Sequence, residues 1–268
     1  MVIDFHSHIF PEKIASRTIE KLEGIAHVKA FSNGKEEGLL SSMEAAGVGV
    51  SLVLPVVTKP EQFASVSHFA AQLNEAYQGR RPRLFSFGGI HPESADYKEK
   101  LRAIRDMGLR GIKLHPDYQE TYFDDIRYMR ILDYASELGL ISVIHAGVDI
   151  GFPEHVHCTP QMARRVLDEV APQNMVLAHY GGFGMWEDVE ELLAGRDVYF
   201  DTAYTLGFLE DEVFLRILKK HGADKVLFAT DSPWSGQRES LDHLMQLPIC
   251  PEDRDKILWR NAERLLQG

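Results

Sequence analysis

Eight short apolar runs, rich in β-branched residues, recur along the chain, and a polar or glycine-containing turn follows each run. They occupy residues 2–8, 50–56, 83–90, 110–115, 140–146, 174–180, 197–203 and 225–231. Most of these runs are nearly continuous rather than alternating, which is typical of parallel strands buried on both faces. Because parallel strands need crossover connections that are usually helical, the pattern predicts alternating strands and helices.

Helical periodicity is visible between the runs, where apolar residues recur at intervals of three and four. The clearest stretches are residues 61–78, 125–139 and 186–195. Glycines end them, at Gly79, Gly139 and Gly195, where a left-handed cap residue is expected. The connection between residues 10 and 50 is long enough for two more helices.

Alternating strands and helices belong to an α/β protein, either a closed barrel or an open doubly wound sheet. Eight repeating units favour a (β/α)8 TIM barrel. No Pro- or Ser-rich linker divides the sequence, so we expect residues 1–268 to form a single domain.

Composition and charge narrow the choice of partner. The chain is 44% hydrophobic and has no apolar run near the ~20 residues that a membrane span needs. Its formal net charge of −11 leaves no surplus of positive charge for nucleic acid or an anionic membrane surface. We therefore expect a small-molecule substrate, no nucleic acid and no membrane.

Cysteine usage and the amino terminus bear on location. Cys158 and Cys250 are isolated in the sequence, which indicates neither a disulfide framework nor a zinc knuckle. The amino terminus has Asp4 and two histidines where a secretion signal needs an apolar run. We expect a cytoplasmic protein, and the sequence leaves monomer and homodimer open.

Histidines and a carboxylate gather at the ends of the predicted strands. His6 and His8 are two residues apart, so they project to one face of the first strand. His145, His179 and Asp231 end the fifth, sixth and eighth strands, at the edge where barrel enzymes place their active sites. One such residue alone is as readily a packed core histidine, but their coincidence on four strands predicts a metal site.

The donor set does not select one metal. Neutral imidazole and carboxylate suit zinc, and they also suit manganese, iron or nickel. Zinc is the default expectation, with one or two ions left open.

Several motifs together resemble the amidohydrolase superfamily, and within it the amidohydrolase 2 group, which also includes decarboxylases. They are DFHSH at residues 4–8, GIKLHP at 111–116, HAG at 145–147, AHYGG at 178–182 and ATDSPW at 229–234. The resemblance implies that His6, His8, His145 and Asp231 hold the metal and that Asp231 is also the general base. It implies for His179 either a second metal or an acid–base role.

Lys113 occupies the position where some members of this superfamily carry a carboxylated lysine that bridges two metals. Its neighbourhood resembles the dihydroorotase version of that strand. The alternative is a lysine that binds a substrate carboxylate or pairs with an acidic side chain.

Three residues are candidates for binding the substrate. His115 has the same strand parity as Lys113, and His157 lies in the loop after the fifth strand. Arg238 follows Asp231 closely and is the expected partner of a substrate carboxylate. A histidine in such a position is more often structural than catalytic, and the alternative for Arg238 is a solvated side chain at the start of the last helix.

The leading hypothesis is a metal-dependent hydrolase that cleaves an amide, lactone or ester-like bond with a metal-activated water. The first alternative is a metal-dependent decarboxylase of an unsaturated or aromatic acid, because the resemblance covers both reactions. A phosphoesterase is the second alternative, and a barrel that binds metal or metabolite without turnover is the third.

Overall fold

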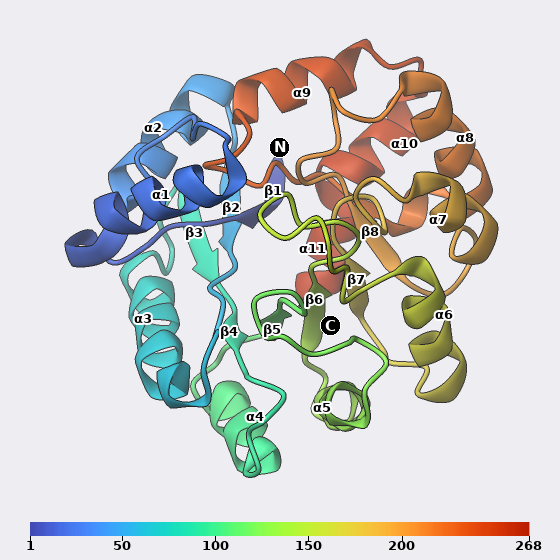
Figure 1. Ribbon diagram of the computed structural model, residues 1–268. Helices are drawn as coiled ribbons and strands as arrows, with labels where there is room; N and C mark the ends of the chain where they lie inside the picture. Colours follow the sequence, from blue (N-terminus) through green and yellow to red (C-terminus); the bar gives the residue numbers. More distant parts are fainter. Residues whose placement is uncertain (268) are drawn as a thin grey trace.

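The computed structural model describes residues 1–267, and its strands alternate with helices along the whole of that range. Figure 1 shows the strands at the centre and the helices around them. The strands are β1 (Ile3–Ser7), β2 (Val50–Val53), β3 (Arg83–Ser86), β4 (Gly88–Gly89), β5 (Gly111–Leu114), β6 (Ile141–Ile144), β7 (Met175–Leu177), β8 (Tyr199–Asp201) and β9 (Val226–Leu227).

Helices cover the three stretches with clear periodicity, two lie between residues 10 and 50 as expected, and others follow the remaining strands. They are α1 (Glu12–Ala26), α2 (Glu36–Ala46), α3 (Phe63–Ala76), α4 (Tyr97–Asp106), α5 (Ile126–Glu137), α6 (Pro160–Glu169), α7 (Trp186–Leu192), α8 (Asp211–His221), α9 (Gln237–Gln246), α10 (Pro251–Asp255) and α11 (Asn261–Gln267). Short 3-10 turns occupy Pro60–Gln62 and Ala223–Lys225, and a π turn spans Lys256–Arg260. Gly79, Gly139 and Gly195 have the positive φ expected after a helix.

All neighbouring strands are parallel, and their order follows the sequence. One group runs β1-β2-β3 and the other runs from β4 to β9. Only Phe87 separates β3 from β4, so these two strands form one stave of the predicted eight.

Backbone contacts join the first stave to the last. Phe5 N donates to Phe228 O (2.9 Å), and Asp231 N donates to His6 O (2.8 Å). A parallel bridge links Ser7 to Ser232 just beyond β9. The predicted (β/α)8 TIM barrel is confirmed.

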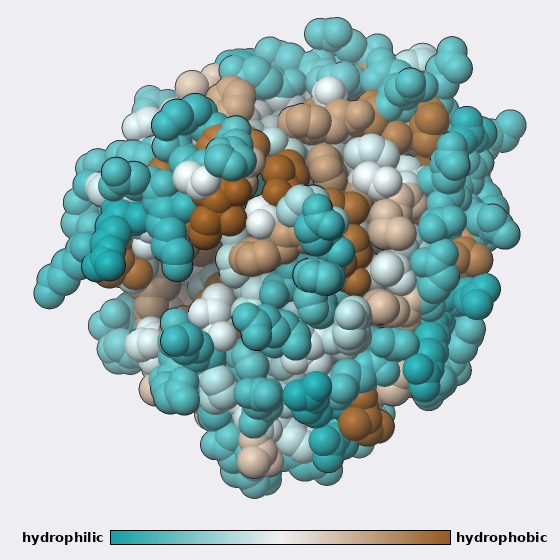
Figure 2. All heavy atoms as spheres, in the orientation of Figure 1, coloured by the Kyte–Doolittle hydropathy of each residue, from teal (hydrophilic) through white to brown (hydrophobic). Residues whose placement is uncertain are grey.

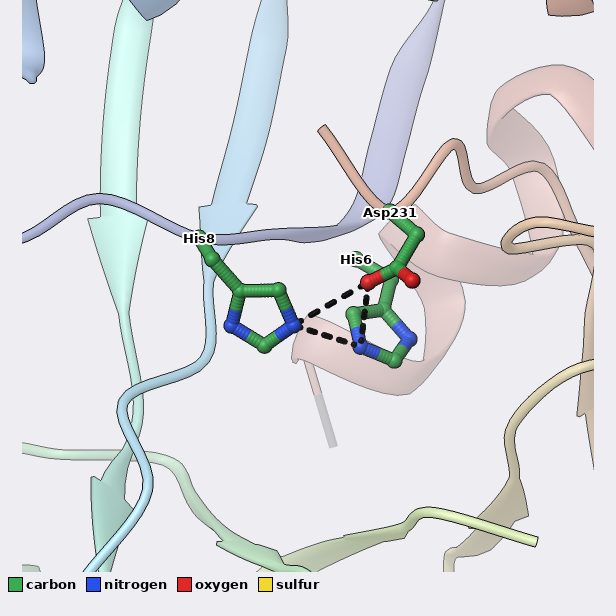
Figure 3. Close-up of side chains that lie close together, drawn as sticks. All are labelled: His6, His8 and Asp231. Carbon is green, nitrogen blue, oxygen red and sulfur yellow. Dashed lines mark hydrogen bonds and ion pairs between the residues drawn. The ribbon is translucent and has the colours of Figure 1, made fainter. Parts of the chain in front are cut away.

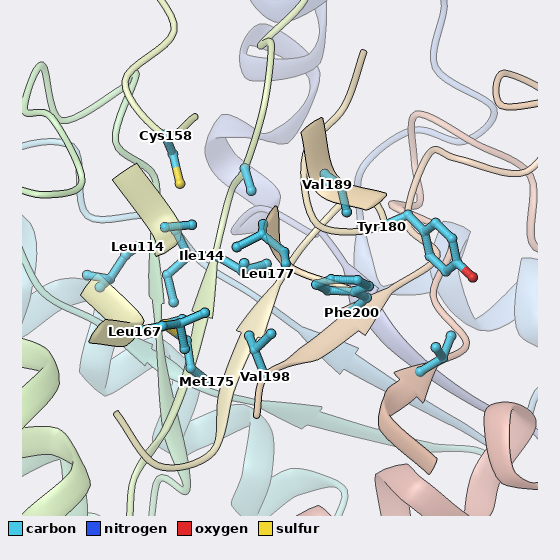
Figure 4. Packing of buried hydrophobic residues seen from close by; sticks show 14 of the residues in the cluster. Leu114, Ile144, Cys158, Leu167, Met175, Leu177, Tyr180, Val189, Val198 and Phe200 are labelled. Carbon is cyan, nitrogen blue, oxygen red and sulfur yellow. The ribbon is translucent and has the colours of Figure 1, made fainter. Parts of the chain in front are cut away.

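Two apolar clusters pack on opposite faces of the strands. One fills the inside of the barrel and includes Phe5, Leu52, Val143 and Leu227. The larger one lies between strands and helices, and Figure 4 shows part of it around Leu177. Burying both faces explains why the strand sequences are continuous apolar runs.

An irregularity in β1 directs polar residues to different neighbours. Three steps along β1, from Asp4 to Ser7, match two steps along β2. Asp4 accepts hydrogen bonds from Thr230 and from Gln237 on α9, whereas His6 contacts the residues at the barrel mouth. On a regular strand, residues two apart point to the same face. The extra residue in β1 breaks this alternation, so the side chains of Asp4 and His6 point to different neighbours.

Candidate metal centre

Six of the predicted site residues meet at the carboxyl ends of the strands. They come from five of the strands and lie at the same edge of the barrel. They are His6 on β1, His8 just after it, Lys113 on β5, His145 after β6, His179 beyond β7 and Asp231 beyond β9.

Three of these side chains converge on one point, as Figure 3 shows. His6 Nε2 lies 3.2 Å from His8 Nε2, and Asp231 Oδ1 lies 3.4 Å and 3.1 Å from these two nitrogens. Ligands about 2.1 Å from one metal ion stand about 3.0 Å apart at right angles and about 3.4 Å apart in a tetrahedron. The three donor atoms are therefore spaced as ligands of a single divalent cation.

The outer nitrogen of each histidine near this point has a fixed partner. His6 Nδ1 lies 2.9 Å from Asp201 Oδ2, His8 Nδ1 lies 2.8 Å from Leu54 O, and His179 Nδ1 lies 2.9 Å from Ala203 O. An N–H that donates to such an acceptor leaves the other ring nitrogen with a free lone pair. Partners of this kind orient histidine ligands in metal sites.

His145 contacts the site through its ring nitrogen Nδ1. Its Nδ1 lies 2.9 Å from His179 Nε2. Two neutral imidazole nitrogens at this separation need either a proton or a cation between them, because two bare lone pairs repel. His145 also belongs to a second group of side chains that could hold a metal ion, with His115 and Asp149.

Lys113 is buried at the base of the site. Its Nζ lies 3.1 Å from His6 Nε2, and burial lowers the pKa of this lysine to about 8, although Asp201 and Asp231 oppose the shift. A lysine of this pKa is partly neutral near physiological pH, which an amine needs before it can be carboxylated. The structure brings Lys113 to the predicted position, and its bridging role stays a prediction.

Burial also keeps the histidines neutral. It is the largest cause of the lowered pKa values of His6, His115, His145 and His179. Neutral imidazole is the form that binds metal, so burial and ligation favour the same protonation state.

Two site residues hold strained backbone conformations. His179 and Asp231 have φ values of 58° and 67°, in the left-handed region that non-glycine residues rarely adopt. Backbone strain of this kind concentrates at functional sites, where surrounding contacts maintain it. Here the Asp201 carboxylate accepts from His179 N and the His6 carbonyl accepts from Asp231 N.

The three predicted substrate-binding residues differ in how close they lie to the site. His115 stacks on His145, with ring centroids 4.0 Å apart, and belongs to the site. His157 lies farther out and reaches it through Asp117, which accepts from His157 N at 3.0 Å. Arg238 is not brought to the site, because its guanidinium donates to Ala45 O at the end of α2 and pairs with Asp242.

Three carboxylates at the site are absent from the sequence prediction. Asp201 accepts from both His6 and His179, and Asp117 and Asp149 face His145 from the loops after β5 and β6. The rule that site residues lie at the carboxyl ends of the strands would also have found Asp201, because it is the last residue of β8. The sequence holds no comparable signal for the two loop residues.

Comparison with known families identifies the class. Residues 3–268 match the family model described as Amidohydrolase, so the chain belongs to the amidohydrolase family. The superfamily predicted from the motifs is confirmed, and with it an enzyme fold.

Proteins similar in sequence or in structure include decarboxylases. Over 129 residues the chain is 26% identical to gamma-resorcylate decarboxylase of Polaromonas sp. (strain JS666 / ATCC BAA-500), a match spanning 42% of this chain and 40% of that enzyme. A dihydroxybenzoic acid decarboxylase from Polaromonas sp. JS666, solved with manganese and the inhibitor 2-nitroresorcinol, has a TM-score of 0.73 at 16% identity, over 99% of this chain and 96% of that one. A 5-carboxyvanillate decarboxylase from Sphingomonas paucimobilis has a TM-score of 0.70 at 15% identity, covering 99% and 98% of the two chains.

These comparisons correct the leading functional prediction. The hydrolase prediction is wrong, because the sequence relative is a decarboxylase, and this match favours the first alternative. The ligand set fits both reactions, and the short chain, with little room for an added subdomain, was the ground for preferring hydrolysis. The zinc prediction has no support in these relatives, one of which holds manganese.

No helix in residues 1–267 combines the length and apolar character that crossing a membrane requires.

Proposed function

We propose that this chain is a metal-dependent decarboxylase of an aromatic acid. The observation that carries the proposal is the sequence match to gamma-resorcylate decarboxylase. The donor set at the barrel mouth supports it, and so does the shared fold with two further decarboxylases.

The surroundings of the donor set suit an aromatic ring. Phe183 lies 6.4 Å from the His179 ring and contacts Tyr204 and Phe208, which stack on each other at 4.3 Å. On the other side, Tyr118 packs edge to face on His115. Aromatic side chains favour stacked or edge contacts with a planar ring, so these residues offer it two walls.

The chain's own residues divide into metal-holding and orienting groups. We assign His6, His8 and Asp231 to a divalent ion, with Mn²⁺ as the first candidate and zinc as the second, and the family resemblance adds His145 to these ligands. When bound, the ion supplies positive charge that attracts the substrate carboxylate and stabilises negative charge near it. Asp201 holds His6 in position through the 2.9 Å contact to Nδ1.

Asp231 is assigned a second role in proton transfer. Its Oδ1 faces the two histidines, while Figure 3 shows that the other carboxyl oxygen points away from His8. In the reaction the carbon–carbon bond to the carboxylate breaks and carbon dioxide leaves. The electron pair of that bond stays with the ring carbon, and Asp231 would take up a proton from solvent and deliver it to that carbon. The His179 ring lies beside the His6 ring and adds a neutral imidazole to the site.

The test measures carbon dioxide release. The Mn²⁺-loaded protein is given 2,6-dihydroxybenzoate, 5-carboxyvanillate and related aromatic acids, with the His6→Ala/His8→Ala double variant as the matched control. Carbon dioxide release by the native chain and none by the variant supports the proposal. If no aromatic acid loses carbon dioxide while the metal is bound, the assignment of a decarboxylase is wrong.

A further inference from the structure

The donor set at the barrel mouth is largely covered in this structure. The side chains of His6, Asp231 and His8 are only 1%, 12% and 16% exposed. Figure 2 shows side chains, several of them hydrophobic, over the centre of the face. Below the donor set, an apolar cluster fills the inside of the barrel. An organic substrate therefore reaches these atoms through the mouth, and only if part of the mouth moves.

One segment of the mouth differs from its neighbours in burial. Gly147 and Cys158 are both buried, but none of residues 148–157 between them is. By contrast, the segments that follow β5, β7 and β9 are mostly buried. In Figure 1 the yellow-green segment after β6 passes in front of the strands. We call residues 148–157 the mouth loop.

The mouth loop is fixed at its ends and bonded only to itself between them. Gly147 N donates to Cys158 O (2.8 Å), and Val148 N donates to Phe183 O (2.9 Å). Within the part of the chain that the structure describes, every hydrogen bond of residues 149–156 is made to another member of the mouth loop. A surface loop with joined ends and few outside bonds can move as a unit at little cost.

Two contacts hold the mouth loop over the donor set. On one side, Asp149 Oδ2 lies 3.4 Å from His115 Nε2 and 3.8 Å from His145 Nε2, which is longer than a good hydrogen bond. On the other side, a Cβ atom at Gly151 would lie 3.0 Å from Ile25 Cγ2, near the end of α1. Both contacts can break without unfolding a helix or a strand.

The end of α1 is the fixed partner in the second contact. α1 buries Ala15 and Ile19 against the rest of the protein. The chain that follows α1 is joined to the segment after β9, where Phe31 N donates to Pro233 O (2.7 Å). Ile25 is thus an edge on which the mouth loop rests.

We propose that the mouth loop is a lid over the donor set, that it swings about the joined ends Gly147 and Cys158, and that the contact of Gly151 with Ile25 is its latch. The structure shows the closed position. The open position admits the metal ion and the substrate, whichever reaction follows, so the inference goes beyond the proposed function. Loops at this end of a barrel border the active site, and loops of this kind in enzymes close over substrates.

A disulfide across the latch tests the lid. The 3.0 Å between the Gly151 Cβ position and Ile25 Cγ2 is about the distance from a Cβ atom to the far sulfur of a disulfide. The Ile25→Cys/Gly151→Cys variant is loaded with Mn²⁺ while reduced and is then oxidised. Release of Mn²⁺ to EDTA should be at least about 10-fold slower than from the same protein reduced again with a phosphine.

Single variants separate the latch from the substitutions. Gly151→Cys alone places the same Cβ atom 3.0 Å from Asp149 Oδ1 but cannot bridge to position 25, so oxidation should not change its rate of Mn²⁺ release. Ile25→Ala removes the latch contact and should speed release by about 3-fold. Ile14→Ala is the matched control, because Ile14 is exposed on the same helix, and it should leave the rate unchanged.

Two results would overturn the lid. One is an equal rate of Mn²⁺ release from the oxidised and the reduced double variant, with the disulfide confirmed by mass spectrometry. The other is failure of the two cysteines to pair, because the closed contact requires that they meet. Neither result depends on turnover, so the lid and the decarboxylase proposal fail separately.

Discussion

The two ends of the same barrel strands differ in what their buried side chains do. Inside the barrel, Leu52, Val143 and Leu227 pack into an apolar cluster and satisfy one another by contact alone. Toward the carboxyl ends of the strands, His6, Lys113 and Asp231 are also buried, but they need specific partners. The apolar end stabilises the fold, and the polar end holds a function that the fold must support.

The largest expected effect is at the polar end. Asp231→Asn keeps the size of the side chain but removes the negatively charged oxygen that would bind the metal ion and the carboxyl group that transfers the proton. We expect carbon dioxide release to fall by at least about 1000-fold while the free energy of unfolding changes by less than about 1 kcal/mol. Steady-state kinetics and urea unfolding measure the two quantities. Activity within 10-fold of the native chain would remove Asp231 from the mechanism.

The apolar end should respond in the opposite way. Leu52 is fully buried, and Leu52→Ala leaves a cavity inside the barrel. The expected loss of stability is about 2–5 kcal/mol, measured by chemical denaturation. Metal content should stay at the native value below the unfolding transition. If Leu52→Ala lost metal at denaturant concentrations below its unfolding transition, the apolar end of the strands would also control the metal site.

A buried histidine away from the mouth sharpens the contrast. His221 stacks on Phe200 and accepts from Gly195 N, and burial lowers its pKa from 6.5 to about 4. The unfolded chain therefore binds the proton more readily. This contribution to stability is complete above about pH 6.5 and is lost as the pH falls toward 4, by roughly 3 kcal/mol.

The variant His221→Gln isolates that contribution, because the site histidines titrate equally in both proteins. The difference in unfolding free energy between the native chain and the variant should be smaller at pH 5 than at pH 8. Parallel pH profiles would show that His221 does not titrate in this range.

A smaller effect is expected when a partner of a metal-holding histidine is changed. Asp201→Asn keeps an oxygen that can accept from His6 Nδ1 but removes the negative charge. Loss of such a partner weakens metal affinity by about 10- to 100-fold. Competition with a chelator measures the dissociation constant, and an unchanged value would mean that Asp201 does not orient His6.

The smallest effect is expected from Arg238→Ala. The guanidinium is half exposed and is engaged with Ala45 and Asp242, away from the donor set. KM for an aromatic acid should stay within about 2-fold of the native value, as is usual for exposed charges of this kind. A rise of 10-fold or more would return Arg238 to the substrate site.

Strand parity and the carboxyl-end rule predict much of the site. They bring His6, His8, Lys113, His145 and Asp231 together, because parallel strands fix both the edge and the face of their last residues. The motifs then indicate the family that the comparison confirms.

The residues that escape prediction depend on features without a local pattern. Asp117 and Asp149 lie in loops, whose course the strands do not determine. The direction of Arg238 depends on how α9 packs beside α2. The reaction is harder still, because hydrolases and decarboxylases of this superfamily share ligands, and specificity lies in the surrounding loops.

The central claim is that His6, His8 and Asp231 hold a divalent cation. Plasma mass spectrometry of protein purified without added metal, beside the His6→Ala/His8→Ala variant, tests it most directly. We predict one to two equivalents of a first-row divalent metal in the native chain, and its loss in a variant that remains folded. No bound metal in the native chain even after incubation with Mn²⁺ or Zn²⁺, or equal metal in both proteins, would contradict the account.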